Sequence, residues 1–127
     1  MQGQVDYSLA RKAVLRALES GRVARREVCD AHPDLLRAAG YSGDPVASPC
    51  PVCGGAELRL VSYVFSDELP KRENGRLWPR EELAPLLKLE EARLYTVEVC
   101  LDCSWNHLRS QLVLGRGSER RGREAST

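Results

Sequence analysis

Two CxxC pairs, Cys50 with Cys53 and Cys100 with Cys103, constrain the fold of this chain more than any other feature. In each pair a tight turn can direct two thiolates at one point, and two such turns supply the four soft ligands of a tetrahedral zinc site. Four thiolates close the coordination shell, whereas a catalytic zinc keeps one position open for water or substrate. The spacing therefore predicts a structural Zn²⁺ site held by all four cysteines.

Three alternatives stay open at this site. His107, four residues after Cys103, is a replacement ligand that would give three thiolates and one imidazole. An iron–sulfur cluster also takes four cysteines, although two separate knuckles favour zinc. Thioredoxin-like CxxC pairs begin a helix within a βαβ unit, and neither pair of this chain does so. A thiol-based redox sensor or enzyme that uses Cys29 or a labile CxxC is nevertheless the second functional hypothesis.

The segments around the second pair predict a zinc-ribbon hairpin. Residues 93–99 and 107–114 both alternate between apolar and polar side chains, which is typical of strands on either side of a knuckle. Residues 57–65 predict a third strand with apolar side chains on both faces, so we expect it to be central and covered. Between these strands, 66–80 predicts a loop and 81–91 a helix that is interrupted, or begins late, at its proline.

The N-terminal part predicts three short helices, over residues 6–20, 23–30 and 33–39. Gly21 and Gly40 are expected to end the first and the third. For the first helix, Asp6 or Ser8 is the expected cap, and these residues are the expected apolar face: Leu9, Ala13, Val14, Ala17 and Leu18, with Arg11, Lys12 and Arg16 on the remainder. Cys29 lies in the second helix, where a single cysteine is most often a small buried hydrophobe.

These elements predict an α+β protein with a short helical unit followed by a small antiparallel zinc-ribbon sheet. The turn-rich residues 41–49 place a boundary between a helical unit at 1–47 and a ribbon domain at 48–115, with an inserted loop and helix at about 66–93. Residues 116–127 have almost nothing to bury and predict a disordered tail.

The charge distribution argues against a nucleic-acid footprint over the whole chain. Residues 50–103 carry seven Lys/Arg against ten Asp/Glu, while 1–49 carry seven against six and 104–127 five against two. A direct nucleic-acid binder is therefore the third functional hypothesis. No apolar run approaches membrane-spanning length, the N-terminus lacks the pattern of a signal peptide, and an odd number of cysteines fits a reducing compartment, so we expect a cytoplasmic protein.

Several motifs together resemble a known family. They are Glu27-Val28-Cys29-Asp30-Ala31 with Leu35-Leu36-Arg37-Ala38-Ala39, Cys50-Pro51-Val52-Cys53, Val97-Glu98-Val99-Cys100, and Cys103-Ser104-Trp105-Asn106-His107-Leu108. Over roughly residues 5–115 the chain resembles a family of small actinobacterial proteins, domain of unknown function 5318. The resemblance implies a cytoplasmic protein with a zinc ribbon and a helical N-terminal part. It also implies that Cys29-Asp30-Ala31 and Trp105-Asn106-His107 are family features.

The first functional hypothesis is a non-catalytic zinc-ribbon adaptor, not an enzyme, that contacts a protein or ribonucleoprotein such as the transcription or translation machinery. No membrane partner and no small-molecule substrate is expected. The candidate contact residues follow the second knuckle or lie in the second helix; they are Trp105, Asn106, His107, Arg109, Arg25 and Arg26. For Trp105 the alternative is that the indole packs over the metal site and shields it.

Overall fold

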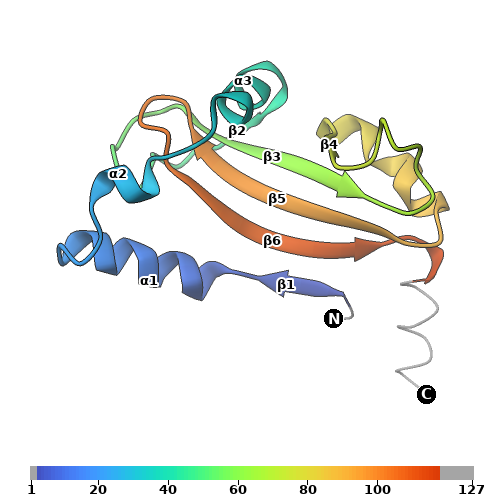
Figure 1. The fold of residues 1–127 in the computed structure, drawn as a ribbon, viewed down its shortest axis with the longest axis horizontal. Helices are drawn as coiled ribbons and strands as arrows, with labels where there is room; N and C mark the ends of the chain where they lie inside the picture. Colours follow the sequence, from blue (N-terminus) through green and yellow to red (C-terminus); the bar gives the residue numbers. More distant parts are fainter. Residues whose placement is uncertain (1–2, 118–127) are drawn as a thin grey trace. The chain divides into compact units, whose positions relative to one another are not determined.

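The computed structural model describes residues 3–117 and shows an α+β fold, as the sequence predicts (Figure 1). The helices are α1 (Ser8–Glu19), α2 (Arg25–Val28) and α3 (Pro33–Ser42), with 3₁₀ turns at Arg80–Glu82 and Ala84–Lys88. The strands are β1 (Gln4–Asp6), β2 (Asp44–Pro45), β3 (Leu58–Phe65), β4 (Arg76–Leu77), β5 (Ala92–Cys100) and β6 (Asn106–Leu114).

All six strands belong to one sheet with the order β1–β6–β5–β3–β2, and β4 pairs with β3 outside that path. The short strands pair antiparallel with long ones: Gln4 lies opposite Leu112, Asp44 opposite Leu60, and Tyr63 opposite Leu77. The long strand β5 runs opposite to its neighbours β3 and β6 (Figure 1). Strand, knuckle and strand thus follow one another in a hairpin, as predicted.

The contacts divide the described chain into two compact units. The knuckle unit comprises residues 7–61 and 97–109, and the loop unit comprises 3–6, 62–96 and 110–117. The N-terminal helices fall in the same unit as both cysteine pairs, whereas the sequence placed a boundary near residues 47–48. The division into two independently folding domains at that boundary stays a prediction. Of the predicted tail, residues 118–127 lie outside the described residues.

Each unit has its own apolar core. In the knuckle unit the buried residues are Cys50, Leu58, Cys100 and Trp105, and side chains of α1 and α2 pack against them. In the loop unit they are Val64, Leu86, Ala92 and Leu94. None of the helices within residues 3–117 has the length and apolar character needed to cross a bilayer.

The first helix differs from its prediction in its cap and in its buried face. Its N-cap is Tyr7, whose side chain makes no capping bond but whose N–H donates to the carbonyl of Arg109 at 3.0 Å. Leu9, expected on the apolar face, is 81% exposed, and Val14 and Leu15 are the residues that pack on the core. The buried face is therefore rotated relative to the predicted one.

Three further predictions are corrected. The third helix continues through Gly40 to Ser42, and Gly43 forms the C-cap, with its N–H donating to the carbonyl of Ala39 at 2.9 Å. The helix expected over 81–91 is two 3₁₀ turns, since Pro85 lacks the N–H that an α-helix interior needs. The loop expected over 66–80 contains the two residues of β4, which pair with β3.

Candidate metal centre

The first knuckle is shaped by backbone bonds that turn its two thiols inward. The N–H of Cys50 donates to the carbonyl of Gly55, and the N–H of Gly54 donates back to Cys50, each at 2.9 Å. Gly54 has a φ of 75°, a conformation that favours glycine. A side chain on Gly55 would approach the Cys53 sulfur at 3.2 Å and the carboxylate of Asp102 at 2.7 Å, so the glycine allows the two knuckles to come together.

The second knuckle closes the β5–β6 hairpin in the same way. The N–H of Cys100 donates to Trp105 at 2.8 Å, and the N–H of Ser104 donates to Cys100 at 3.0 Å. Ser104 has a φ of 69° and occupies the position that Gly54 occupies in the first knuckle, directly after the second cysteine of the pair. The N–H of Leu101 also donates to the carbonyl of Glu57 at 3.0 Å, which ties this knuckle to the residue before β3.

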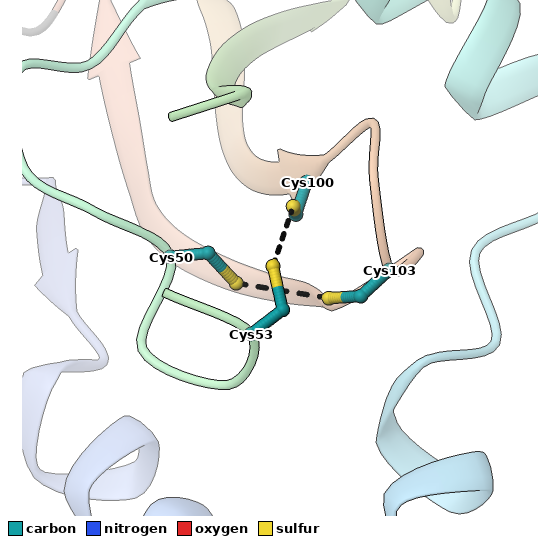
Figure 2. A group of neighbouring side chains, drawn as sticks. All are labelled: Cys50, Cys53, Cys100 and Cys103. Atoms are coloured by element: carbon teal, nitrogen blue, oxygen red, sulfur yellow. Dashed lines mark hydrogen bonds between the residues drawn. The ribbon is translucent and has the colours of Figure 1, made fainter. Parts of the chain in front are cut away.

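The four sulfur atoms converge, and their ligand atoms all lie within 4.8 Å of one another (Figure 2). Sγ of Cys50 is 3.7 Å from Sγ of Cys103, and Sγ of Cys53 is 3.7 Å from Sγ of Cys100. A tetrahedral ion with metal–sulfur distances of about 2.3 Å places its sulfurs about 3.8 Å apart, while a disulfide requires about 2.05 Å. The spacing fits four thiolates around a single metal ion.

Burial and backbone donors set the acidity of these thiols. Burial raises the pKa of Cys50 and of Cys100, and it raises the pKa of Cys103 to about 11. The N–H of Gly55, 3.4 Å from the sulfur of Cys53, lowers the pKa of that thiol. A metal ion would have to displace protons from the three thiols whose pKa is raised, because only thiolates bind it.

A buried carboxylate that the sequence analysis did not single out lies behind the knuckle. Glu98 is fully buried on β5. Arg11 of α1 donates to both of its oxygens at 2.8 and 2.9 Å, Arg109 of β6 donates at 2.9 Å, and the indole N–H of Trp105 donates at 2.7 Å. These bonds hold α1 against the ribbon hairpin and fix the tryptophan that packs on the metal-site core.

Cys29 lies next to the metal centre but outside the group of four. Its sulfur is 3.8 Å from that of Cys103 and is half-buried. The residues after it are fastened to the second knuckle, because the N–H of Ala31 donates to Ser104 at 3.1 Å and the amide of Asn106 donates to the carboxylate of Asp30 at 2.9 Å. These bonds link the Cys29-Asp30-Ala31 segment with the residues around Trp105.

The predicted contact residues have diverse environments. Trp105 is fully buried in the core of the knuckle unit, where it packs with Cys50, Leu58 and Cys100. His107 stacks on that indole, with ring centres 5.9 Å apart, and its Nδ1 is 2.7 Å from the carbonyl of Leu108. It does not belong to the four-ligand group found among the described residues. Arg25 and Arg26 are exposed on α2.

The loop unit contains an open cavity of about 620 Å³ beside the first residues after β3. Its lining residues are Phe65, Ser66, Asp67, Glu68, Asn74, Glu90, Glu91 and Arg93. The carboxylate of Glu68 accepts from the N–H groups of Glu90 and Glu91 at 3.1 and 3.0 Å, so it serves to hold the cavity wall together. These two bonds tie the segment after Phe65 to the residues that precede β5.

Comparisons with known proteins agree with the resemblance found in the sequence. The model of a family of unknown function, DUF5318, matches residues 1–127. Uncharacterized protein Rv0049 of Mycobacterium tuberculosis and Uncharacterized protein Mb0050 of Mycobacterium bovis are each 41% identical to this chain over 111 residues. In both cases the match covers 87% of this chain and 81% of the relative. No solved structure matches the chain.

Proposed function

The chain belongs to the DUF5318 family, and we propose that it is a non-catalytic zinc-ribbon adaptor of the cytoplasm that binds an acidic segment of a partner protein. The observation that carries the proposal is the group of four cysteine sulfurs within 4.8 Å of one another. Two of these cysteines, Cys50 and Cys100, are buried in the core of the knuckle unit.

The donor set supports zinc in a structural role. Tetrahedral sites of four thiolates are characteristic of zinc or of iron, and the two-knuckle arrangement is that of structural zinc. Cys50, Cys53, Cys100 and Cys103 would occupy every coordination position, so a bound zinc ion would have no place for a substrate or a reactive water. Such an ion would join the segment before β3 to the β5–β6 hairpin.

The charge of the first two helices supports an acidic partner. Residues 8–28 contain six arginines and lysines and two glutamates, a net charge of +4. Of these groups, Arg11 is paired with Glu98, and Glu27 accepts a bond from the N–H of Ala24. Lys12, Arg16 and Arg26 are exposed and form no ion pair with any carboxylate of residues 3–117.

Metal analysis of the purified protein tests the first half of the proposal. We expect one zinc ion per chain, and loss of that zinc in Cys100→Ser, because three thiolates and a hydroxyl hold zinc far more weakly than four thiolates. Cys29→Ser is the matched control, since it removes a neighbouring thiol that is not one of the four ligands. A protein with iron in place of zinc, or without bound metal, would overturn this half.

Binding of labelled oligomers tests the second half. A fluorescent oligoglutamate peptide and a single-stranded RNA of equal length are titrated with the zinc-loaded protein, and anisotropy is recorded. We expect the peptide to bind, and Arg26→Glu to weaken its binding about three- to fivefold, since a single exposed pair contributes up to about 1 kcal/mol. The control is Arg37→Glu, which makes the same charge change on α3, where Arg37 pairs with Asp34 at 2.9 Å.

The peptide and the RNA distinguish an acidic protein partner from a nucleic-acid partner. Binding of the peptide that depends on Arg26 but not on Arg37 supports an acidic protein partner. Tighter binding of the RNA replaces that partner with a nucleic acid, and binding of neither probe overturns the proposed surface. Both titrations are repeated at higher salt, because contacts between exposed charges are screened.

A further inference from the structure

The geometry points to a second role for the metal centre, and we infer that Cys29 forms a disulfide with Cys103 when a peroxide oxidises the protein, which opens the zinc site. The inference rests on the proposed zinc site and adds its regulation. Cys29 is the fifth thiol of the centre: its sulfur lies 3.8 Å from that of Cys103, about as close as the ligand sulfurs lie to one another.

The position of Cys29 is built into the fold rather than accidental. Its N–H donates to the carbonyl of Arg25 at 2.9 Å, so it forms the C-cap of the four-residue helix α2. Two residues later, Ala31 is bonded to Ser104, the neighbour of Cys103. The backbone is thus held on both sides of Cys29, and the two sulfurs need to approach by only about 2 Å to form a bond.

Exposure and charge favour the same pair. Cys29, Cys53 and Cys103 are half-buried, whereas Cys50 and Cys100 are buried. Of the half-buried thiols, Cys29 is the one outside the four-ligand group, and Cys103 is the ligand that it contacts. Arg25 is exposed next to the pair, and its guanidinium donates a hydrogen bond to the Cys29 sulfur. A peroxide therefore meets a thiol that is not a member of the four-ligand group, with a positive charge beside it and a second sulfur in contact.

The reaction is balanced in two steps. The Cys29 sulfur attacks one oxygen of the peroxide, the O–O bond breaks, and Cys29 becomes a sulfenic acid while the other oxygen leaves as water. The Cys103 thiolate then attacks the Cys29 sulfur, forms the S–S bond and expels hydroxide, which takes a proton from the solvent. Two electrons have passed from the two sulfurs to the peroxide, and the zinc ion has lost one of its four ligands.

Peptide mapping after oxidation tests the inference directly. Zinc-loaded protein is treated with hydrogen peroxide, remaining thiols are blocked with N-ethylmaleimide, and the chain is digested with trypsin. Cleavage after arginine places Cys29 in residues 27–37, Cys50 with Cys53 in 38–59, and Cys100 with Cys103 in 94–109. We expect 27–37 joined to 94–109, with fragmentation spectra that assign the bond to Cys103.

Zinc release, followed with a chromogenic chelator, is the second measurement. We expect Cys29→Ser to release zinc at least about fivefold more slowly than the wild type, because the oxidant must then attack thiolates whose electrons are shared with the metal. Reduction with dithiothreitol should restore zinc binding in the wild type.

The outcomes separate this inference from the proposed function. If the only crosslink joins 38–59 to 94–109, or if Cys29→Ser releases zinc at the wild-type rate, Cys29 has no such role. Zinc content is measured before the oxidant is added. A chain without zinc at that stage refutes the proposed metal site, whereas a zinc-loaded chain that fails to form the crosslink refutes only the switch.

Discussion

Replacing Glu98 with glutamine should destabilise the protein strongly, although the two side chains have nearly the same shape. The carboxylate is fully buried and accepts four hydrogen bonds. Its Oε1 accepts from Arg11 and Arg109, and its Oε2 accepts from Arg11 and Trp105. Glutamine keeps one acceptor oxygen and presents an NH₂ group at the other position, so two of the four donors lose their acceptor.

The size of the effect follows from which donors are lost. Trp105 is fully buried and cannot turn to solvent, so the glutamine oxygen should stay with it and the NH₂ should face the Oε1 position. The side chains of Arg11 and Arg109 are 23% and 38% exposed, so water relieves part of their loss. Removing one partner of a buried ion pair costs about 3–5 kcal/mol, and with this relief we expect about 3 kcal/mol for Glu98→Gln.

Denaturant unfolding of the zinc-loaded variants at constant free zinc measures this difference. The matched control is Glu57→Gln, because Glu57 is half-exposed and pairs with Arg59 at 2.8 Å. We expect the control to lose less than about 1 kcal/mol. A loss at Glu98 no larger than at Glu57 would show that the buried network does not stabilise the fold.

The pH dependence gives an independent check on the same network. Burial by itself would raise the pKa of Glu98, but the bonds from Arg11, Trp105 and Arg109 outweigh it and leave that pKa lowered. The carboxylate therefore contributes its full stability above the ordinary glutamate pKa of about 4.3, and the contribution is lost as pH falls through the lowered folded-state value. The difference in unfolding free energy between wild type and Glu98→Gln should be constant above about pH 5 and shrink below about pH 4, whereas an unchanged difference in acid would contradict this assignment.

Removal of the metal and substitution of two glycines of α3 and its C-cap should each change the stability of the protein. Removing the metal with excess chelator should lower the Tm by at least about 10 °C, because a structural zinc contributes folding energy directly; an unchanged Tm after complete metal loss would contradict a structural role. In α3, Gly40→Ala should raise the unfolding free energy by about 0.5–1 kcal/mol, since nothing lies within 4 Å of the added methyl group. Gly43→Ala should lower it by about 2 kcal/mol, since its methyl group would meet the carbonyl oxygen of Ala39 at 2.5 Å; denaturant unfolding should show opposite signs for the two.

The metal site could be predicted because its determinants are local. The CxxC spacing, Gly54 and Gly55, and the alternation on either side of the second pair are properties of a few neighbouring residues. The convergence of two knuckles across an interval of 46 residues, 54–99, then follows from the chemistry of zinc. The fold class followed in turn from the strands that flank the knuckles.

The face of α1 could not be predicted from hydrophobicity. Its inward side includes Arg11, Val14 and Leu15, which are three and four residues apart, and the arginine reaches a buried acid. A prediction that places every arginine in solvent puts Leu9 on the packed face of this helix instead of Arg11, although Leu9 is exposed. The same reasoning placed Glu98 on a polar face, although it lies two residues before a knuckle and its partner Arg109 lies six residues after it, on the neighbouring strand.

The shortest strands and the 3₁₀ turns near Pro85 could not be predicted from the sequence for another reason. β1 and β2 have three and two residues, too few for any periodicity, and Pro45 of β2 is unusual within a strand. They form because β6 and β3 supply hydrogen-bonding partners that lie outside these short segments. For residues 80–88 the leucine pattern and Pro85 together predict a shortened helix, whereas the structure has two 3₁₀ turns.

The order of the knuckles along the chain has a consequence for synthesis in the cell. Cys53 leaves the ribosome 47 residues before Cys100, an interval of about 2–10 s at ordinary rates of translation. During that time the nascent chain carries only half of the ligands, and α1 has not yet met Glu98, which arrives just before the second pair. The four ligands of the knuckle unit therefore come together only after the second pair has been made, so a metal ion that needs all four cysteines cannot be bound before that point.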